Sequence, residues 1–307
     1  MMVLFLIFEI EMALKTDYGN VRTMVAIENP MVRRGAMGLL NQIGFKNIIE
    51  LSNFVKIHQI VNDEEVDLII ANSDMSDFFV GQILKEMRIN LKSITTFAIT
   101  VLLSQHADHD YLRKVIDCGP DDVILMPFSP QQLIDRVKNF TERRKPFIVT
   151  FNYVGPDRRK QARHDGSEEI PLVEVPNLLQ ARARLGSSPN LKENAEKALQ
   201  RLTMLRIQRC GVQIRWLCDA IRKLILANKH DAPELTEHMN GIAATCQDLK
   251  MRTADWTNER MQALIAESET AVSAALANYA RLDIRQVERT IDVAGKVSAE
   301  ITRVFSN

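Results

Sequence analysis

The feature that most constrains the fold is the alternation of short apolar runs with amphipathic stretches between Val21 and Thr141. Short apolar runs bounded by turn residues are typical of buried strands, and the stretches between them have the spacing of helices. Strict alternation of the two predicts an α/β doubly wound domain with a five-stranded parallel sheet, whose ligands bind at the carboxyl ends of the strands. The predicted strands are Thr23–Ile27, Asn47–Leu51, Leu68–Ala71, Phe97–Leu103 and Asp122–Leu125, and the predicted helices are Pro30–Ile43, Ser52–Asn62, Phe79–Ile89, His109–Cys118 and Pro130–Asn139.

Outside this α/β domain, which we place at residues 21–142, the chain divides into three segments. Residues 1–20 form an N-terminal extension whose apolar start is far shorter than the ~20 residues that span a bilayer, so we expect no membrane span. It lacks the marks of a secretory signal, and we interpret residues 1–11 as an upstream start, with a short membrane-surface anchor as the alternative. Residues 143–187 contain prolines and basic runs and predict a linker, and residues 188–307 predict a helical domain.

Four long segments of the helical domain repeat apolar residues at 3.6-residue spacing, which predicts an antiparallel bundle. The first segment, Leu191 to Ala227, would be about 57 Å long as a single helix. It would extend beyond its partners, so we expect part of its apolar face to pair with a second subunit in a homodimer. Gly211 offers an alternative, a break into two helices. The shortest predicted apolar stripe consists of His238, Ile242, Cys246 and Leu249.

Charge is balanced over the whole chain, with 39 Lys+Arg and 39 Asp+Glu, which argues against a general nucleic-acid binder. The local exception is Lys138–Asp165, where eight basic residues accompany three acidic ones. This segment also contains aromatic residues, and the mixture favours docking on the α/β domain or on a protein partner, with nucleic acid as the alternative. The candidate docking residues are Phe147, Tyr153, Arg158 and Arg159.

The chain has four cysteines, and their spacing in the sequence does not match that of a zinc site. We interpret them as buried thiols of a cytoplasmic protein and expect no metal or cofactor.

Several stretches of the first domain, taken in order and spacing, resemble the receiver domain of two-component response regulators, the CheY-like fold. The resemblance implies a flavodoxin-like sheet with a phosphorylation site at its carboxyl edge. In that family an Asp after the third strand accepts the phosphoryl group, two acidic residues after the first strand help to hold Mg²⁺, and a Lys contacts the phosphoryl oxygens. The matching stretches are Glu28–Arg34, Asp67–Met75, Leu102–Ser104, Cys118–Asp122 and Met126–Pro130.

Three of the family's charged groups are replaced in this chain. The phosphoacceptor position is Asn72, and an amide is a poor nucleophile and a poor Mg²⁺ ligand. The acidic pair is Ile27 and Glu28, which leaves one carboxylate and at most a residual Mg²⁺ contact at Glu28. The Lys position is Met126, whose thioether offers nothing to a phosphoryl oxygen. We therefore interpret the domain as a pseudo-receiver that is not phosphorylated at Asn72.

Other positions of the family pattern are kept or altered less severely. Ser104 keeps the hydroxyl position, Pro127 keeps a proline that is preceded by a cis peptide in the family, and Val123 stands at the aromatic switch position. The competing hypothesis is that Asp74 or Asp77, in the loop after the third strand, accepts phosphate instead. Loop carboxylates are more often solvated turn residues.

Other motifs suggest chemistry less strongly. His106–Asp110 has the composition of a metal cluster, but its spacing matches no rigid site, and it fits the start of a helix. Glu237 and Asn240 resemble the pair that some chemotaxis phosphatases insert into a receiver. His230 and His238 lack the pattern of a phosphotransfer histidine.

Taken together, these patterns predict a non-enzymatic bacterial signalling protein of the cytoplasm. A receiver-like domain that accepts no phosphate at the usual position would bind a histidine kinase, a receiver or an output protein, and the helical domain would dimerise. A phosphorylation-dependent regulator and a helical phosphatase or phosphotransfer module remain the alternatives. We expect protein partners rather than nucleic acid.

Overall fold

The computed structural model describes residues 16–76, 78–159, 170–184, 190–229, 233–277 and 283–306. The chain divides into two compact units, Met1–Leu202 and Thr203–Asn307. Most of the predicted N-terminal extension, residues 1–15, lies outside the described residues. None of the helices in the described ranges combines the length and the apolar character that a bilayer-spanning segment needs.

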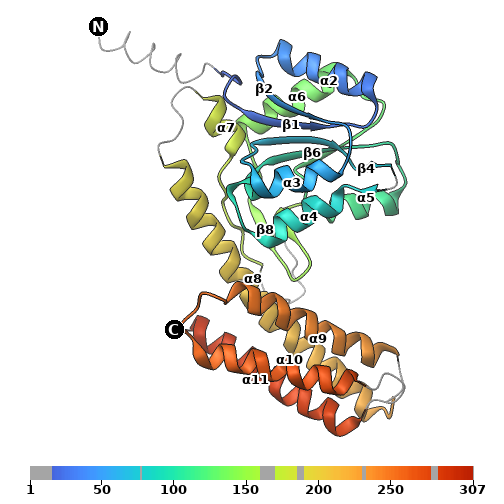
Figure 1. The fold of residues 1–307 in the computed structure, drawn as a ribbon, viewed down its shortest axis with the longest axis vertical. Helices are drawn as coiled ribbons and strands as arrows, with labels where there is room; N and C mark the ends of the chain where they lie inside the picture. The colour runs from blue at the N-terminus through green and yellow to red at the C-terminus, as the bar shows by residue number, and fades with distance from the viewer. Residues whose placement is uncertain are drawn as a thin grey trace. The chain divides into compact units, whose positions relative to one another are not determined.

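A five-stranded parallel sheet forms the centre of the first unit, in the order β2-β1-β3-β6-β7 (Figure 1). This order confirms the predicted doubly wound α/β fold. The fourth predicted strand begins two residues late because its first residues form a short 3₁₀ helix, Ile94–Phe97. The strands are β1 Arg22–Ala26, β2 Asn47–Leu51, β3 Leu68–Asn72, β6 Ile99–Ser104 and β7 Asp122–Leu125.

Helices cover both faces of this sheet (Figure 1). One apolar core lies between the sheet and α2 and α6, through Leu40, Leu133 and Val137. The other lies under α3, α4 and α5, through Leu84 and Val115 among others. The helices are α2 Pro30–Gln42, α3 Val55–Asp63, α4 Gly81–Asn90, α5 His109–Ile116 and α6 Pro130–Glu142.

Capping side chains set several of the helix starts. Asn29 accepts hydrogen bonds from the first-turn amides of α2, Asp108 does so for α5, and Ser129 for α6. The predicted start of α4 at Phe79 is wrong, because Phe78–Phe79 is a short strand, β5, that pairs antiparallel with β4, Asp74–Met75. A hairpin with two-residue strands carries no periodicity that a sequence could show.

The segment after α6, predicted as a linker, contains regular structure in its described residues. Strands β8 Phe147–Val149 and β9 Val154–Pro156 form an antiparallel hairpin, and α7 Leu178–Ala183 follows. Val173 pairs with Phe147 in an isolated bridge. Leu179 and Ala183 of α7 belong to the same core cluster as α2 and α6, so this part of the segment is packed within the first unit.

The described part of the second unit is helical between its turns, which confirms the predicted all-α region. Gly211 does not break α8, which runs through it as one helix, and the residue lies against α11: a Cβ at Gly211 would be 3.1 Å from Ile301. The apolar stripe predicted for α9 is correct at Ile242 but wrong at His238, which is half-buried beside Trp216. The helices are α8 Leu191–Leu226, which begins in the first unit, α9 Pro233–Arg252, α10 Glu259–Leu276 and α11 Ile284–Ser306.

Candidate functional site

Three of the predicted site residues meet at the carboxyl ends of the strands. Asn72 is the last residue of β3 and is 4% exposed. Its Oδ1 accepts a hydrogen bond from the backbone N–H of Glu28, 2.9 Å away, just after β1. Its Nδ2 donates to Sδ of Met126, 3.7 Å away, just after β7. Both ends of the amide are therefore engaged within the chain.

The surviving carboxylate, Glu28, is exposed and turns toward the β4–β5 hairpin. It accepts hydrogen bonds from the backbone N–H of Ser76, at 3.1 Å, and from the Ser76 hydroxyl. Ile27, at the position of the family's first acidic residue, is fully buried in the core. This edge of the sheet therefore has one acidic side chain where the family pattern has two.

A cation that the sequence analysis missed lies at the end of β1. One Nη of Arg33, on α2, donates to the backbone oxygens of Ile27 and Glu28 at 2.6 and 3.0 Å. Its Nε pairs with Glu50 at 2.6 Å, and the side chain is only 13% exposed. The only signal in the sequence is an arginine one turn into the helix that follows the first strand.

The remaining positions of the family pattern make local contacts. The hydroxyl of Ser104 is buried, donates to the backbone oxygen of His106 and accepts from its N–H, so it is engaged in its own loop. The Met126–Pro127 peptide bond is cis. Val123, at the aromatic switch position, packs on the core beneath α5.

A second polar cluster joins Asp74, the alternative acceptor, to His106 and to Ser73 and Tyr111, two residues that the sequence analysis did not single out. Oδ1 of Asp74 accepts hydrogen bonds from the hydroxyls of Ser73 and Tyr111, each at 2.7 Å. Nε2 of His106 lies 3.7 Å from the other carboxylate oxygen. Burial raises the pKa of Tyr111, and the Asp74 carboxylate raises it further, so the phenol stays protonated and continues to donate. Asp77, the other candidate acceptor, lies outside the described residues.

The Mg²⁺ that the receiver resemblance implies does not fit these side chains. Mg²⁺ requires several hard oxygen ligands in octahedral geometry. The pocket offers the Glu28 carboxylate, already bound to Ser76, and the Asn72 oxygen, already bound to a backbone N–H. Among the described residues no group of three or more His, Cys, Asp or Glu side chains is arranged to hold a metal. In the His106–Asp110 motif, Asp108 is the cap of α5.

Of the candidate docking residues of the linker, Phe147 and Arg158 contact the α/β domain, and Tyr153 and Arg159 bond to neighbouring linker residues. Phe147 is fully buried, with the guanidinium carbons of Arg88 and Arg144 at 5.1 and 4.8 Å from its ring centroid. The Tyr153 hydroxyl donates to the backbone oxygen of Pro156 at 2.8 Å. Arg158 donates to the backbone oxygens of Pro120 and Asp121, and Arg159 pairs with Asp157.

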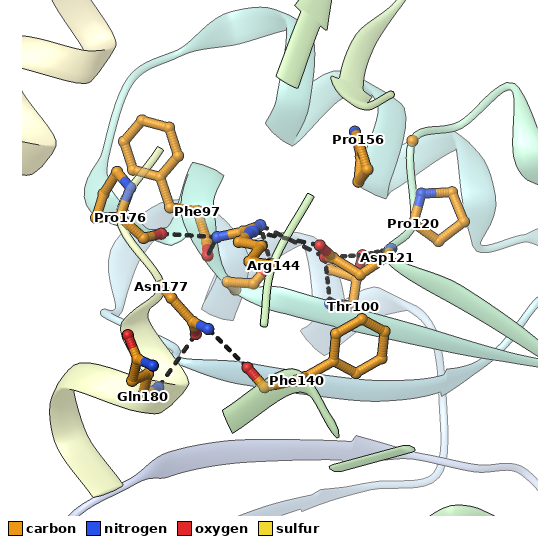
Figure 2. Close-up of polar contacts among 12 residues, drawn as sticks. Phe97, Thr100, Pro120, Asp121, Phe140, Arg144, Pro156, Pro176, Asn177 and Gln180 are labelled. Carbon is orange, nitrogen blue, oxygen red and sulfur yellow. Dashed lines mark hydrogen bonds and ion pairs between the residues drawn. The ribbon is translucent and has the colours of Figure 1, made fainter. Parts of the chain in front are cut away.

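A buried cluster of three charges underlies this docking. Asp121 pairs with Arg88 at 2.9 Å and with Arg144 at 3.3 Å, and all three side chains are at most 4% exposed. Figure 2 shows Arg144 between Asp121 and the backbone oxygens of Phe97 and Pro176. Burial lowers the pKa of Arg88 to about 10, although Asp121 opposes the shift, so the arginine remains charged at neutral pH.

The candidate residues of the helical region belong to the second unit. Glu237 and Asn240 are exposed on α9, and the His238 ring lies edge-on to Trp216 at 5.5 Å. His230 lies outside the described residues.

Residues 24–138 match the family model described as the response regulator receiver domain. Among curated proteins, the phosphate regulon transcriptional regulatory proteins PhoB of Escherichia coli (strain K12) and Shigella flexneri are each 25% identical over 128 residues, which is 42% of this chain and 55% of theirs. The chain thus spans about half the length of the curated relatives it matches.

Solved structures with a similar fold are receiver domains and response regulators. A response regulator from Thermotoga maritima has 22% identity and a TM-score of 0.34, covering 39% of this chain and 96% of that chain. The receiver domain of the putative response regulator NarL from Mycobacterium tuberculosis has 16% identity and a TM-score of 0.36, covering 41% and 98%.

Proposed function

We propose, from the premise that residues 24–138 form a response regulator receiver domain, that this chain is a signalling regulator that acts by binding proteins and accepts no phosphate at Asn72. The observation that carries the proposal is the engagement of the Asn72 amide at both ends, with the Glu28 backbone and with Met126. A neutral amide whose oxygen and nitrogen are both hydrogen-bonded inside the domain is a poor nucleophile.

The surroundings of Asn72 support the same proposal. Phosphoryl transfer depends on positive charge that stabilises the transferred oxygens. Met126 supplies none, and the guanidinium of Arg33 is engaged with backbone oxygens and Glu50. With one carboxylate and no lysine at these positions, recognition by shape and contact remains the function that this edge of the sheet can perform.

The rest of the proposed role follows from recognition. We expect the partner to be a signalling protein, namely a histidine kinase, another receiver or an output protein, in the cytoplasm. Two copies would associate through the helical region, and no enzymatic step is assigned to the chain. Asp74 is a weak alternative acceptor, because its side-chain contacts within the described ranges are with the Ser73 and Tyr111 hydroxyls and with His106, and none of these is a lysine or an acid.

The proposal can be tested by treating the full chain with acetyl phosphate and Mg²⁺ and measuring its intact mass. We expect no phosphoryl adduct, and no change in amide spectra when beryllofluoride and Mg²⁺ are added. A stoichiometric adduct would overturn the proposal, and peptide mapping would then assign it to Asp74 or to Asp77. The triple variant Ile27→Asp, Asn72→Asp, Met126→Lys is the matched control, because it restores the three missing groups and should gain a beryllofluoride response.

A further inference from the structure

The large apolar side chains exposed on α8 gather on one side of the helix. Met204, Val212, Trp216 and Leu226 are 39, 38, 57 and 83% exposed. With 3.6 residues per turn they fall within an arc of about 120°, along a length of about 33 Å. We call these four residues the α8 stripe. Scattered exposed apolar residues are ordinary, but an aligned row that includes a tryptophan marks an interaction surface.

The α8 stripe lies on the other side of the helix from the residues that α8 contributes to the bundle core. Ile207, Ile214 and Ile221 are fully buried, and they recur every seven residues on a face about 140° from the centre of the stripe. A surface helix normally has one apolar face and a polar face opposite. Apolar side chains therefore also lie on this second face of α8, among the exposed charged residues Arg215, Asp219, Arg222 and Lys223, and within the part of the chain that the structure describes they remain exposed.

The charges around Trp216 indicate what covers the second face. Arg215 and Asp219 are both exposed and lie about one turn apart. Asp219 also forms an ion pair, at 2.9 Å, with Arg222, which lies nearer the C-terminal end of α8. If two α8 helices cross antiparallel about a twofold axis near Leu217, Arg215 of each copy faces Asp219 of the other. The same symmetry brings the two Trp216 side chains together beside the axis. A face that carries both members of the charge pair at equal distances from its centre is complementary to itself.

We propose that the α8 stripe is the surface through which two copies of this chain associate, with Trp216 near the middle of its length. The inference rests on the proposed function in one respect: it assigns a surface to the self-association that was proposed for the helical region. It does not depend on phosphate chemistry. A buried tryptophan at the centre of an interface is the residue type that most often dominates binding.

Light scattering on the full chain, over a series of concentrations, tests the inference. We expect a dimer for the natural sequence and at least about a thirtyfold weaker dimer for Trp216→Glu. Val55→Glu, which places the same charge on an exposed residue of α3, should remain dimeric. Far-ultraviolet circular dichroism of both variants should match the natural chain.

A charge exchange provides the second test, because it does not require removing the tryptophan. Asp219→Arg alone places like charges opposite each other and should weaken the dimer, and the double variant Arg215→Asp, Asp219→Arg should restore much of the loss. A natural chain that is monomeric throughout, or a Trp216→Glu variant that dimerises normally, would overturn the inference. Neither result bears on the phosphoryl adduct, so the two proposals can fail separately.

Discussion

The side-chain nitrogen of Asn72 donates a hydrogen bond to the thioether sulfur of Met126, with 3.7 Å between the two atoms. These two residues stand at the positions where the receiver resemblance implies an aspartate and a lysine. Where the resemblance implies a pair of opposite charges, the structure has a weak contact between neutral groups. This contact joins the ends of β3 and β7, and on the function proposed above it takes the place of the charges that phosphoryl transfer needs.

Replacing Asn72 by alanine should destabilise the first unit by about 1–2 kcal/mol, because the N–H of Glu28 would lose its acceptor. Asn72→Asp keeps an acceptor at the same place and should cost less. Urea unfolding of the full chain, followed by far-ultraviolet circular dichroism, measures both. Equal losses for the two variants would show that the hydrogen bond to Glu28 contributes little.

Arg144→Met should destabilise the first unit by about 3–5 kcal/mol, because it leaves the buried Asp121 with one of its two arginines. The matched control is Arg159→Ala, which removes a more exposed ion pair with Asp157 and should cost at most about 1 kcal/mol. The midpoint of urea unfolding checks the difference. A loss for Arg144→Met as small as that of the control would mean that the segment after α6 is not fastened through Asp121.

Gly119→Ala should also destabilise the first unit, by about 2 kcal/mol or more. Gly119 has φ +78°, and an added Cβ would lie 2.7 Å from the backbone oxygen of Val154 in the hairpin. Gly35→Ala is the control, since its Cβ would meet nothing within 4 Å in the exposed face of α2, and it should stabilise by about 0.5–1 kcal/mol. Thermal unfolding should therefore shift in opposite directions for the two variants.

The free energy of unfolding of the second unit should fall in acid, in part because the Glu300 carboxylate becomes protonated. Its carboxylate accepts hydrogen bonds from Arg303 and Asn258, with Arg260 nearby, and these contacts lower its pKa from 4.5 to about 2. A carboxyl group whose pKa is lower in the folded state stabilises that state above pH 4.5, and this contribution disappears as the pH falls toward 2.

Glu300→Gln should therefore reduce the slope of stability against pH between about pH 5 and pH 2. Glu288→Gln, which removes a carboxylate from an exposed position of α11, is the matched control. Chemical unfolding at a series of pH values provides the comparison. Identical slopes for Glu300→Gln and the natural chain would contradict the assignment.

The sheet could be predicted from sequence because its strands are apolar, short and separated by capped helices. Asp108 belongs to the motif that was expected at a helix start, and it acts as a cap in the structure, as Asn29 and Ser129 do. The β4–β5 hairpin could not be predicted, since its strands have two residues each and depend on tertiary contacts.

The candidate site could be predicted only in part. The receiver resemblance implies that Asn72, Glu28 and Met126 lie together at the carboxyl edge of the sheet, and the structure brings them into contact. Arg33 and Arg144 were not expected inside the fold, because arginines are mostly exposed. Their burial depends on carbonyl and carboxylate partners far away in the sequence, such as Asp121 for Arg144, and no local pattern contains that information.

Arg33 also changes what this edge of the sheet requires from the solution around it. A bound ion leaves when its concentration falls, whereas a guanidinium attached to α2 is held at its position by the backbone and cannot be removed by dialysis or by a chelator. The positive charge at the carboxyl end of β1 is therefore a covalent part of the chain. The first unit should therefore keep its stability when divalent cations are removed from the solution.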